Sequence, residues 1–159
     1  MANPLEPGNK APNFKLPRDG GGTLSLSELT GQSVVLYFYP KDDTPGCTTE
    51  AVEFSALLPK FKRAGTIVVG VSKDPVAKHD KFIKKHDLKV SLVSDEDGKV
   101  LEAYDVWVEK MNYGRKYMGI ERSTFLIDKA GKIARVWRKV RVKGHVDEVL
   151  EAAKTLAKS

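Results

Sequence analysis

The most constraining feature of the chain is an unbroken apolar and aromatic run, Val34–Tyr39, which stops at Pro40. Successive side chains of a strand point to opposite faces of a sheet, so a run without polar positions predicts a strand buried on both faces. Such a strand needs neighbouring strands and a covering layer on each side. The pattern returns at Thr66–Ser72, and the two runs together predict a covered sheet of the α/β class.

Helical patterns alternate with these strands. Between Cys47 and Arg63 the apolar residues recur at spacings of three and four, which predicts one face of a helix. Pro59 should kink or divide that helix. Asp74 and Pro75 fit an N-cap followed by a proline at the first helical position, so a second helix is expected from there.

The remaining segments complete a mixed sheet with helices around it. We expect an N-terminal β-hairpin, a short strand, a short helix, a second hairpin and a closing helix over residues 11–29, 90–93, 99–104, 123–142 and 145–157. The pattern does not assign residues 107–119, where we expect a loop or short helix. This order, with a cysteine where the first core strand passes into the first helix, resembles the thioredoxin fold: a mixed central sheet flanked by helices, here with an N-terminal β-hairpin.

Composition limits the organisation and the partners. A chain of 159 residues with 41% hydrophobic content supports one core, so residues 1–159 are expected to form a single domain. No apolar window is long enough for a membrane span, and we expect a cytoplasmic protein. The net charge of +6 comes from 27 basic and 21 acidic residues that are interspersed, so charge alone does not predict nucleic-acid binding.

The single cysteine, Cys47, carries the strongest chemical signal. With Asp43, Thr44 and Pro45 before it, Cys47 falls in the first turn of the expected helix, where free backbone N–H groups and the helix dipole stabilise a thiolate. The alternative is a buried, inert cysteine. The polar turn that leads to Cys47 is poor core material, so we favour a reactive thiol.

Several thiol chemistries lack their partner groups in this chain. A thioredoxin-type disulfide exchanger needs a second cysteine where Glu50 stands, and the acidic residues after Cys47 would repel a phosphate ester. A cysteine hydrolase needs a histidine base, but His79, His86 and His145 show no recognisable third member of a triad. What remains is a reaction in which the thiolate needs no base, such as attack on the O–O bond of a peroxide.

The residues around Cys47 also resemble a known family. Pro40, Thr44 and Cys47 match the PxxxTxxC motif of the peroxiredoxins, and Glu50 stands at the family's usual position. The segments YFYPKDDTPGCTTEA, LVSDEDGKVLEAYDVW and RSTFLIDKAGKI resemble the Q, or bacterioferritin-comigratory-protein, subfamily. The resemblance extends from about Pro4 to Ala157.

The resemblance implies a role for each site residue. Cys47 is then the peroxidatic nucleophile, Thr44 donates its hydroxyl to the peroxide, and Pro40 shields the thiolate from water. Arg122 would hold the thiolate and the developing oxyanion, and Glu50 would orient Arg122. Taken from the residues alone, Arg122 reads as a solvated arginine at a strand start and Glu50 as an acid at a helix N-terminus. No metal, flavin or haem cofactor is implied.

The chain departs from the subfamily at the resolving cysteine, which members carry five residues after the first or in the next helix. Val52 and Ile83 occupy those places, so no internal disulfide can form, and we expect the first helical turn to stay folded through the cycle. An external thiol, from thioredoxin, glutaredoxin or glutathione, must then reduce the oxidised Cys47. We expect a monomer. The alternative function is a thiol-based redox sensor with negligible turnover.

Two further patterns in the sequence have simple structural explanations. Arg135, Trp137, Lys139, Arg141 and Lys143 would share one face of a long strand, which fits a solvated surface better than contact with nucleic acid or with an acidic reductant. A basic module that binds nucleic acid is the third functional alternative. His79 and His86 lack ligand partners at metal-binding spacing.

Overall fold

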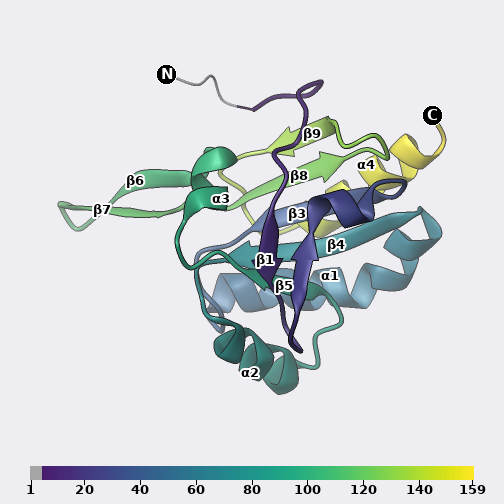
Figure 1. Cartoon of the computed structure of the whole chain (residues 1–159). Helices are drawn as coiled ribbons and strands as arrows, with labels where there is room; N and C mark the ends of the chain where they lie inside the picture. The colour runs from purple at the N-terminus through teal and green to yellow at the C-terminus, as the bar shows by residue number, and fades with distance from the viewer. Residues whose placement is uncertain (1–4) are drawn as a thin grey trace.

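The computed structural model describes residues 5–159 and forms a mixed sheet between two layers (Figure 1). The strands are β1 (Lys15–Pro17), β2 (Thr23–Ser25), β3 (Ser33–Phe38), β4 (Thr66–Ser72), β5 (Ser91–Ser94), β6 (Trp107–Asn112), β7 (Arg115–Ile120), β8 (Ser123–Ile127) and β9 (Ile133–Trp137). The helices are the 3-10 helix η1 (Leu26–Leu29), α1 (Pro45–Arg63), α2 (Val76–His86), α3 (Lys99–Ala103) and α4 (His145–Ala157).

The central sheet has five strands in the order β5-β4-β3-β8-β9. Strand β3 pairs in parallel with β4 and antiparallel with β8, and β4 pairs in parallel with β5. Every residue of β3 is buried, as the unbroken apolar run predicts. The sheet confirms the mixed α/β thioredoxin fold, and β1 and β2 form the expected N-terminal hairpin.

Each face of the sheet packs against a different layer. Val34, Leu36 and Phe38 of β3 point into a cluster closed by the N-terminal hairpin and α3. Val35 and Tyr37 point to the other side, into a cluster with α1, α2 and α4. Figure 1 shows the hairpin in front of the sheet and α1 behind it. Cys47 belongs to this second cluster.

Two helix predictions need correction. Helix α1 runs without a break through Pro59, so the proline does not divide it. Helix α2 begins at Val76 with Pro75 as its N-cap, one position later than predicted. Asp74 is not the cap because its carboxylate accepts hydrogen bonds from the backbone N–H of Asp42 and the hydroxyl of Ser72.

The segment that the sequence pattern left unassigned forms an antiparallel hairpin, β6–β7. The expectation of a loop or short helix there was wrong. In Figure 1 this hairpin extends away from the body of the molecule. Its outer part carries exposed Met111, Tyr113, Tyr117 and Met118.

The second predicted hairpin is shorter than expected. Strand β9 ends at Trp137, and Lys139 has a left-handed backbone with φ 49°. The predicted basic face from Arg135 to Lys143 is therefore not a continuous strand face. Within residues 5–159, no helix is long and apolar enough to cross a membrane.

Candidate active site

The candidate site lies where β3 passes into α1. Thr44 is the N-cap of α1 and Pro45 its first residue, so Cys47 stands in the first turn, as predicted. The Cys47 side chain is 1% exposed. Unpaired N–H groups of a first turn and the positive end of the dipole favour an anion. The fold therefore places the only thiol of the chain, buried, in the first turn of α1.

Arg122 approaches this thiol from a different part of the chain. It precedes β8, whose first residue, Ser123, pairs with Phe38 at the end of β3. Its Nη2 donates to Cys47 Sγ at 3.3 Å and its Nη1 to Glu50 Oε1 at 2.6 Å. Burial lowers the pKa of Arg122, but the charges of Glu50 and Cys47 outweigh that effect and raise it. The guanidinium is thus held between two acidic groups.

Glu50 is fully buried one turn after Cys47. Burial raises its pKa to about 7, even though Arg122 acts in the opposite direction. Its second oxygen, Oε2, has no hydrogen-bond partner among residues 5–159. Glu50 is therefore a buried carboxyl group paired with Arg122, and not a solvated acid at a helix N-terminus.

Thr44 and Pro40 belong to the loop before α1. The Thr44 hydroxyl donates to the carbonyl oxygen of Lys41 at 2.8 Å. Pro40 is exposed at the end of β3. The structure places Arg122 in contact with both Cys47 and Glu50, while donation by Thr44 to a peroxide and shielding by Pro40 stay predictions.

Tyr37, which no sequence pattern singled out, lies behind the site. Its ring stacks on Phe54 with centroids 4.6 Å apart, and it crosses Gly70, where an added Cβ would lie 2.7 Å from the ring. Burial, then the charges of Glu50 and Cys47, raise the pKa of Tyr37 far above its usual range. A glycine inside a buried strand is the signal that could have indicated such a close approach.

Lys110 of the β6–β7 hairpin lies on the same side as the site. Burial, then the nearby charge of Arg122, lower the pKa of Lys110, whereas Cys47 raises it. The hairpin therefore adds a cation to the surroundings of the thiol.

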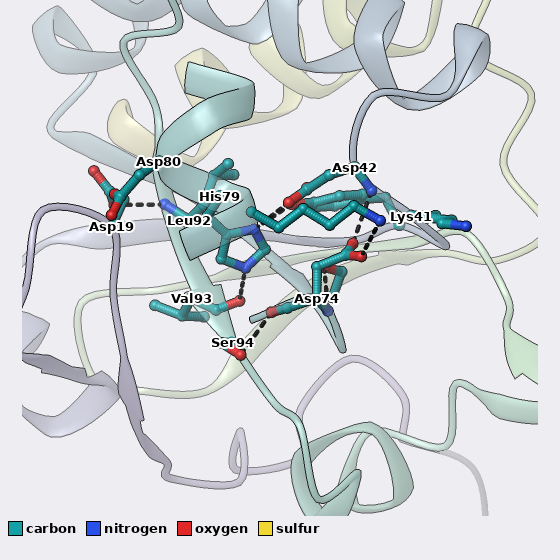
Figure 2. Close-up of polar contacts among 12 residues, drawn as sticks. Asp19, Lys41, Asp42, Asp74, His79, Asp80, Leu92, Val93 and Ser94 are labelled. Carbon is teal, nitrogen blue, oxygen red and sulfur yellow. Dashed lines mark hydrogen bonds and ion pairs between the residues drawn. The ribbon is translucent and has the colours of Figure 1, made fainter. Parts of the chain in front are cut away.

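A buried polar cluster on the far side of the loop was also missed. His79 Nδ1 lies 2.6 Å from Asp42 Oδ2, and both side chains are fully buried (Figure 2). His86 contacts Asp43 at 2.8 Å. Among the described residues, no group of three or more His, Cys, Asp or Glu side chains is arranged to hold a metal ion. Both histidines instead pair with acids of the loop.

The two places where a resolving cysteine was considered differ in exposure. Val52 is 42% exposed on α1. Ile83 of α2 is partly buried and packs against the second core cluster.

Comparison with known proteins gives consistent results. Residues 7–136 match the AhpC/TSA family. Peroxiredoxin Bcp of Bacillus subtilis is 50% identical over 153 residues, which is 96% of this chain and 98% of that protein. The Escherichia coli K12 peroxiredoxin Bcp is 43% identical over 148 residues, which is 93% of this chain and 95% of that protein.

Solved structures agree with these relatives. A Xanthomonas campestris peroxiredoxin Q is 49% identical, with a TM-score of 0.87 and 91% of each chain covered. The bacterioferritin comigratory protein of the same organism, studied for its alkyl peroxide reduction activity, is 45% identical, with a TM-score of 0.88 and 99% of each chain covered.

Proposed function

This chain is a member of the peroxiredoxin family, in its Bcp or Q subfamily, and we propose that Cys47 is the nucleophile of a one-cysteine peroxidase cycle. As a peroxiredoxin the protein is a thiol peroxidase that reduces peroxides. We propose hydrogen peroxide and organic hydroperoxides as substrates. The observation that carries the assignment of roles is the contact of Arg122 with both Cys47 and Glu50.

In the first half of the proposed cycle, the Cys47 thiolate attacks the terminal oxygen of the peroxide. The S–O bond forms as the O–O bond breaks, and the departing oxyanion takes a proton to leave as water or an alcohol. The Arg122 guanidinium, already 3.3 Å from Sγ, stabilises the thiolate and the negative charge that develops on the departing oxygen. The hydrogen of the Thr44 hydroxyl is donated to the Lys41 carbonyl oxygen, so its oxygen accepts from the O–H of the peroxide and orients the two oxygens.

In the second half, an external thiol attacks the sulfur of the Cys47 sulfenic acid and releases water. A second thiol then breaks the mixed disulfide and frees Cys47. The single cysteine of the chain supports this route. We propose thioredoxin, glutaredoxin or glutathione as the reductant, and a monomeric enzyme.

A rapid-mixing experiment tests the nucleophile. Reduced protein is mixed with one equivalent of hydrogen peroxide, Trp107 and Trp137 fluorescence is followed, and the product is trapped with a sulfenic-acid reagent and located by mass spectrometry. We expect a second-order rate far above that of free cysteine and a trapped adduct on Cys47. A rate equal to that of free cysteine, with Cys47→Ser as the blank, would refute the assignment.

Steady turnover separates the enzyme from the redox sensor. The missing resolving cysteine is the observation that favours the sensor, because such a protein would stall after one equivalent of peroxide. We expect continued peroxide consumption when glutathione, glutaredoxin or thioredoxin with its reductase is present. A stall with all three thiol systems would support the sensor instead.

A further inference from the structure

The loop between β3 and α1 is tied to α2 rather than to the helix that carries Cys47. Asp42 of the loop and His79 of α2 point toward one another in Figure 2. The backbone N–H of Asp42 donates to Asp74 Oδ2 at 2.8 Å, just before α2. The next residue, Asp43, accepts from Lys85 at 2.8 Å and contacts His86 at 2.8 Å, near the end of α2.

The bonding around His79 places a hydrogen on its Nε2. Its Nε2 lies 2.9 Å from the carbonyl oxygen of Val93, which can only accept, so Nε2 carries a hydrogen. Its Nδ1 faces Asp42 Oδ2, and the other Asp42 oxygen accepts from the Tyr39 hydroxyl at 2.5 Å. Burial lowers the pKa of His79, but the bonds with Asp42 and Val93 raise it overall. The arrangement is a buried, fully hydrogen-bonded pair.

Asp74 links the same loop to the sheet. The carboxylate that receives the Asp42 N–H also accepts from the Ser72 hydroxyl at 2.9 Å, and Ser94 donates to the Asp74 carbonyl oxygen at 2.6 Å (Figure 2). The ends of β4 and β5 therefore hold the anchor of the loop. Buried polar groups with complete hydrogen bonding fix one arrangement strongly, since any other leaves partners unpaired.

The anchored loop ends at Thr44. Lys41, the neighbour of Asp42, offers its carbonyl oxygen to the Thr44 hydroxyl at 2.8 Å. The position of that hydroxyl thus follows from the position of the loop, which follows from Asp42. Nothing in the proposed peroxide reaction uses His79 or Asp42 directly.

We propose that Asp42 and His79 are positioning residues for peroxide reduction: together they fix the Lys41 carbonyl and, through it, the Thr44 hydroxyl at the mouth of the Cys47 site. The inference rests on the proposed role of Thr44. It predicts that weakening the pair slows the reaction with peroxide without slowing chemistry that needs only the thiol.

A double-mutant cycle tests the coupling. His79→Gln, Thr44→Val and the double variant are each oxidised with hydrogen peroxide in rapid mixing and alkylated with iodoacetamide. We expect His79→Gln alone to slow oxidation about ten-fold. In the Thr44→Val background it should slow oxidation less than about two-fold, and alkylation should be as fast as in the wild type or faster.

Two more variants separate positioning from damage to the fold. Asp42→Asn keeps both side-chain hydrogen bonds of this residue, since its amide can donate to neutral His79 and accept from Tyr39, and we expect oxidation within about three-fold of wild type. Leu101→Ala, which opens a cavity on the other face of the sheet, controls for lost stability. If His79→Gln folds poorly, Tyr39→Phe removes one bond to Asp42 and enters the same cycle.

The outcomes are distinguishable. The proposal is overturned if His79→Gln slows oxidation by the same factor in the wild-type and Thr44→Val backgrounds. It is also overturned if His79→Gln oxidises at the wild-type rate, or if Leu101→Ala slows oxidation as much as His79→Gln does. If Thr44→Val itself oxidises at the wild-type rate, the proposed role of Thr44 fails. If Thr44→Val is slow but His79→Gln is not, only the positioning by α2 fails.

Discussion

Gly46, the residue before Cys47, offers a way to move Arg122 without changing any charge. A Cβ at this position would lie 3.1 Å from Arg122 Nη2, the atom that donates to Cys47 Sγ. Favourable contacts between carbon-sized atoms begin at about 3.5 Å, so Gly46→Ala should displace the guanidinium by about 0.4 Å. The backbone of Gly46 has no left-handed φ, so alanine adds no backbone strain.

The expected effects on rate and stability have opposite signs. A misplacement of about 1 Å costs roughly 100-fold in rate, and scaling its free energy linearly to about 0.4 Å gives roughly a six-fold loss. Alanine is a better helix former than glycine by about 0.5–1 kcal/mol. For a chain of this size, each kcal/mol of added stability raises the unfolding midpoint by about 2–4 °C. The variant should be slower and no less stable.

Rapid mixing with peroxide tests the expected loss of oxidation rate, and thermal unfolding tests the expected gain in stability. Thr49→Ala is the matched control, because it adds helix propensity at an exposed position of the next turn and removes only the hydrogen bond from the Thr49 hydroxyl to the Pro45 carbonyl oxygen. We expect Thr49→Ala to oxidise at the wild-type rate. A Gly46→Ala variant that also keeps the wild-type rate would show that the Arg122–Cys47 contact does not limit the reaction.

The remaining predictions concern single side chains. Cys47→Ser should abolish peroxide turnover while circular dichroism stays unchanged. Tyr37→Phe should stabilise the fold by on the order of 1 kcal/mol in urea unfolding, because the Tyr37 hydroxyl has no partner among residues 5–159; a loss of stability would mean that the hydroxyl is paired. Burial raises the pKa of Glu50 from its usual 4.5 to about 7, so its contribution to stability is full at low pH and is lost as pH rises to about 7. Burial lowers the pKa of His145 from 6.5 to about 4, so its contribution is full above about pH 6.5 and is lost as pH falls to about 4. Between pH 4.5 and 6.5 the two trends oppose each other. The free energy of unfolding should therefore rise with pH more steeply in Glu50→Gln than in the wild type, and it should fall with pH in His145→Gln. Parallel curves for the two variants would contradict the assigned pKa directions.

Local patterns predicted the parts of the fold that local interactions determine. The bounds of β4 and α4 match the expected ranges, since continuous burial and helical periodicity are properties of the segment itself. The β6–β7 hairpin escaped prediction because its turn uses Tyr113 with φ 51° before Gly114, and an aromatic residue rarely adopts that conformation. Strand β9 ends at Trp137, and two residues later Lys139 has a left-handed backbone with φ 49°, which is incompatible with an extended strand and carries no sequence signal at a lysine.

The candidate site divides in the same way. Cys47 and Thr44 were predictable from the residues, since a helix start with a cap and a thiol is local. The residues alone left Arg122 a solvated arginine, and only the family resemblance singled it out, because its contact with Cys47 spans 75 positions. The Asp42–His79 pair spans 37 positions and carries no local signal. The Arg122–Cys47 contact and the Asp42–His79 pair both form only in the tertiary structure.

The absence of a resolving cysteine explains why these long-range contacts are compatible with the proposed cycle. Residues five apart in an intact helix have Cα atoms about 8.6 Å apart, whereas a disulfide needs less than about 7 Å. A cysteine in place of Val52 could therefore meet Cys47 only if the first turn of α1 opened, which would break the contact with Arg122 and strain the anchored loop. With valine there, no step of the proposed cycle requires that opening. Contacts that would resist a two-cysteine cycle can here hold the reacting groups in place at every stage.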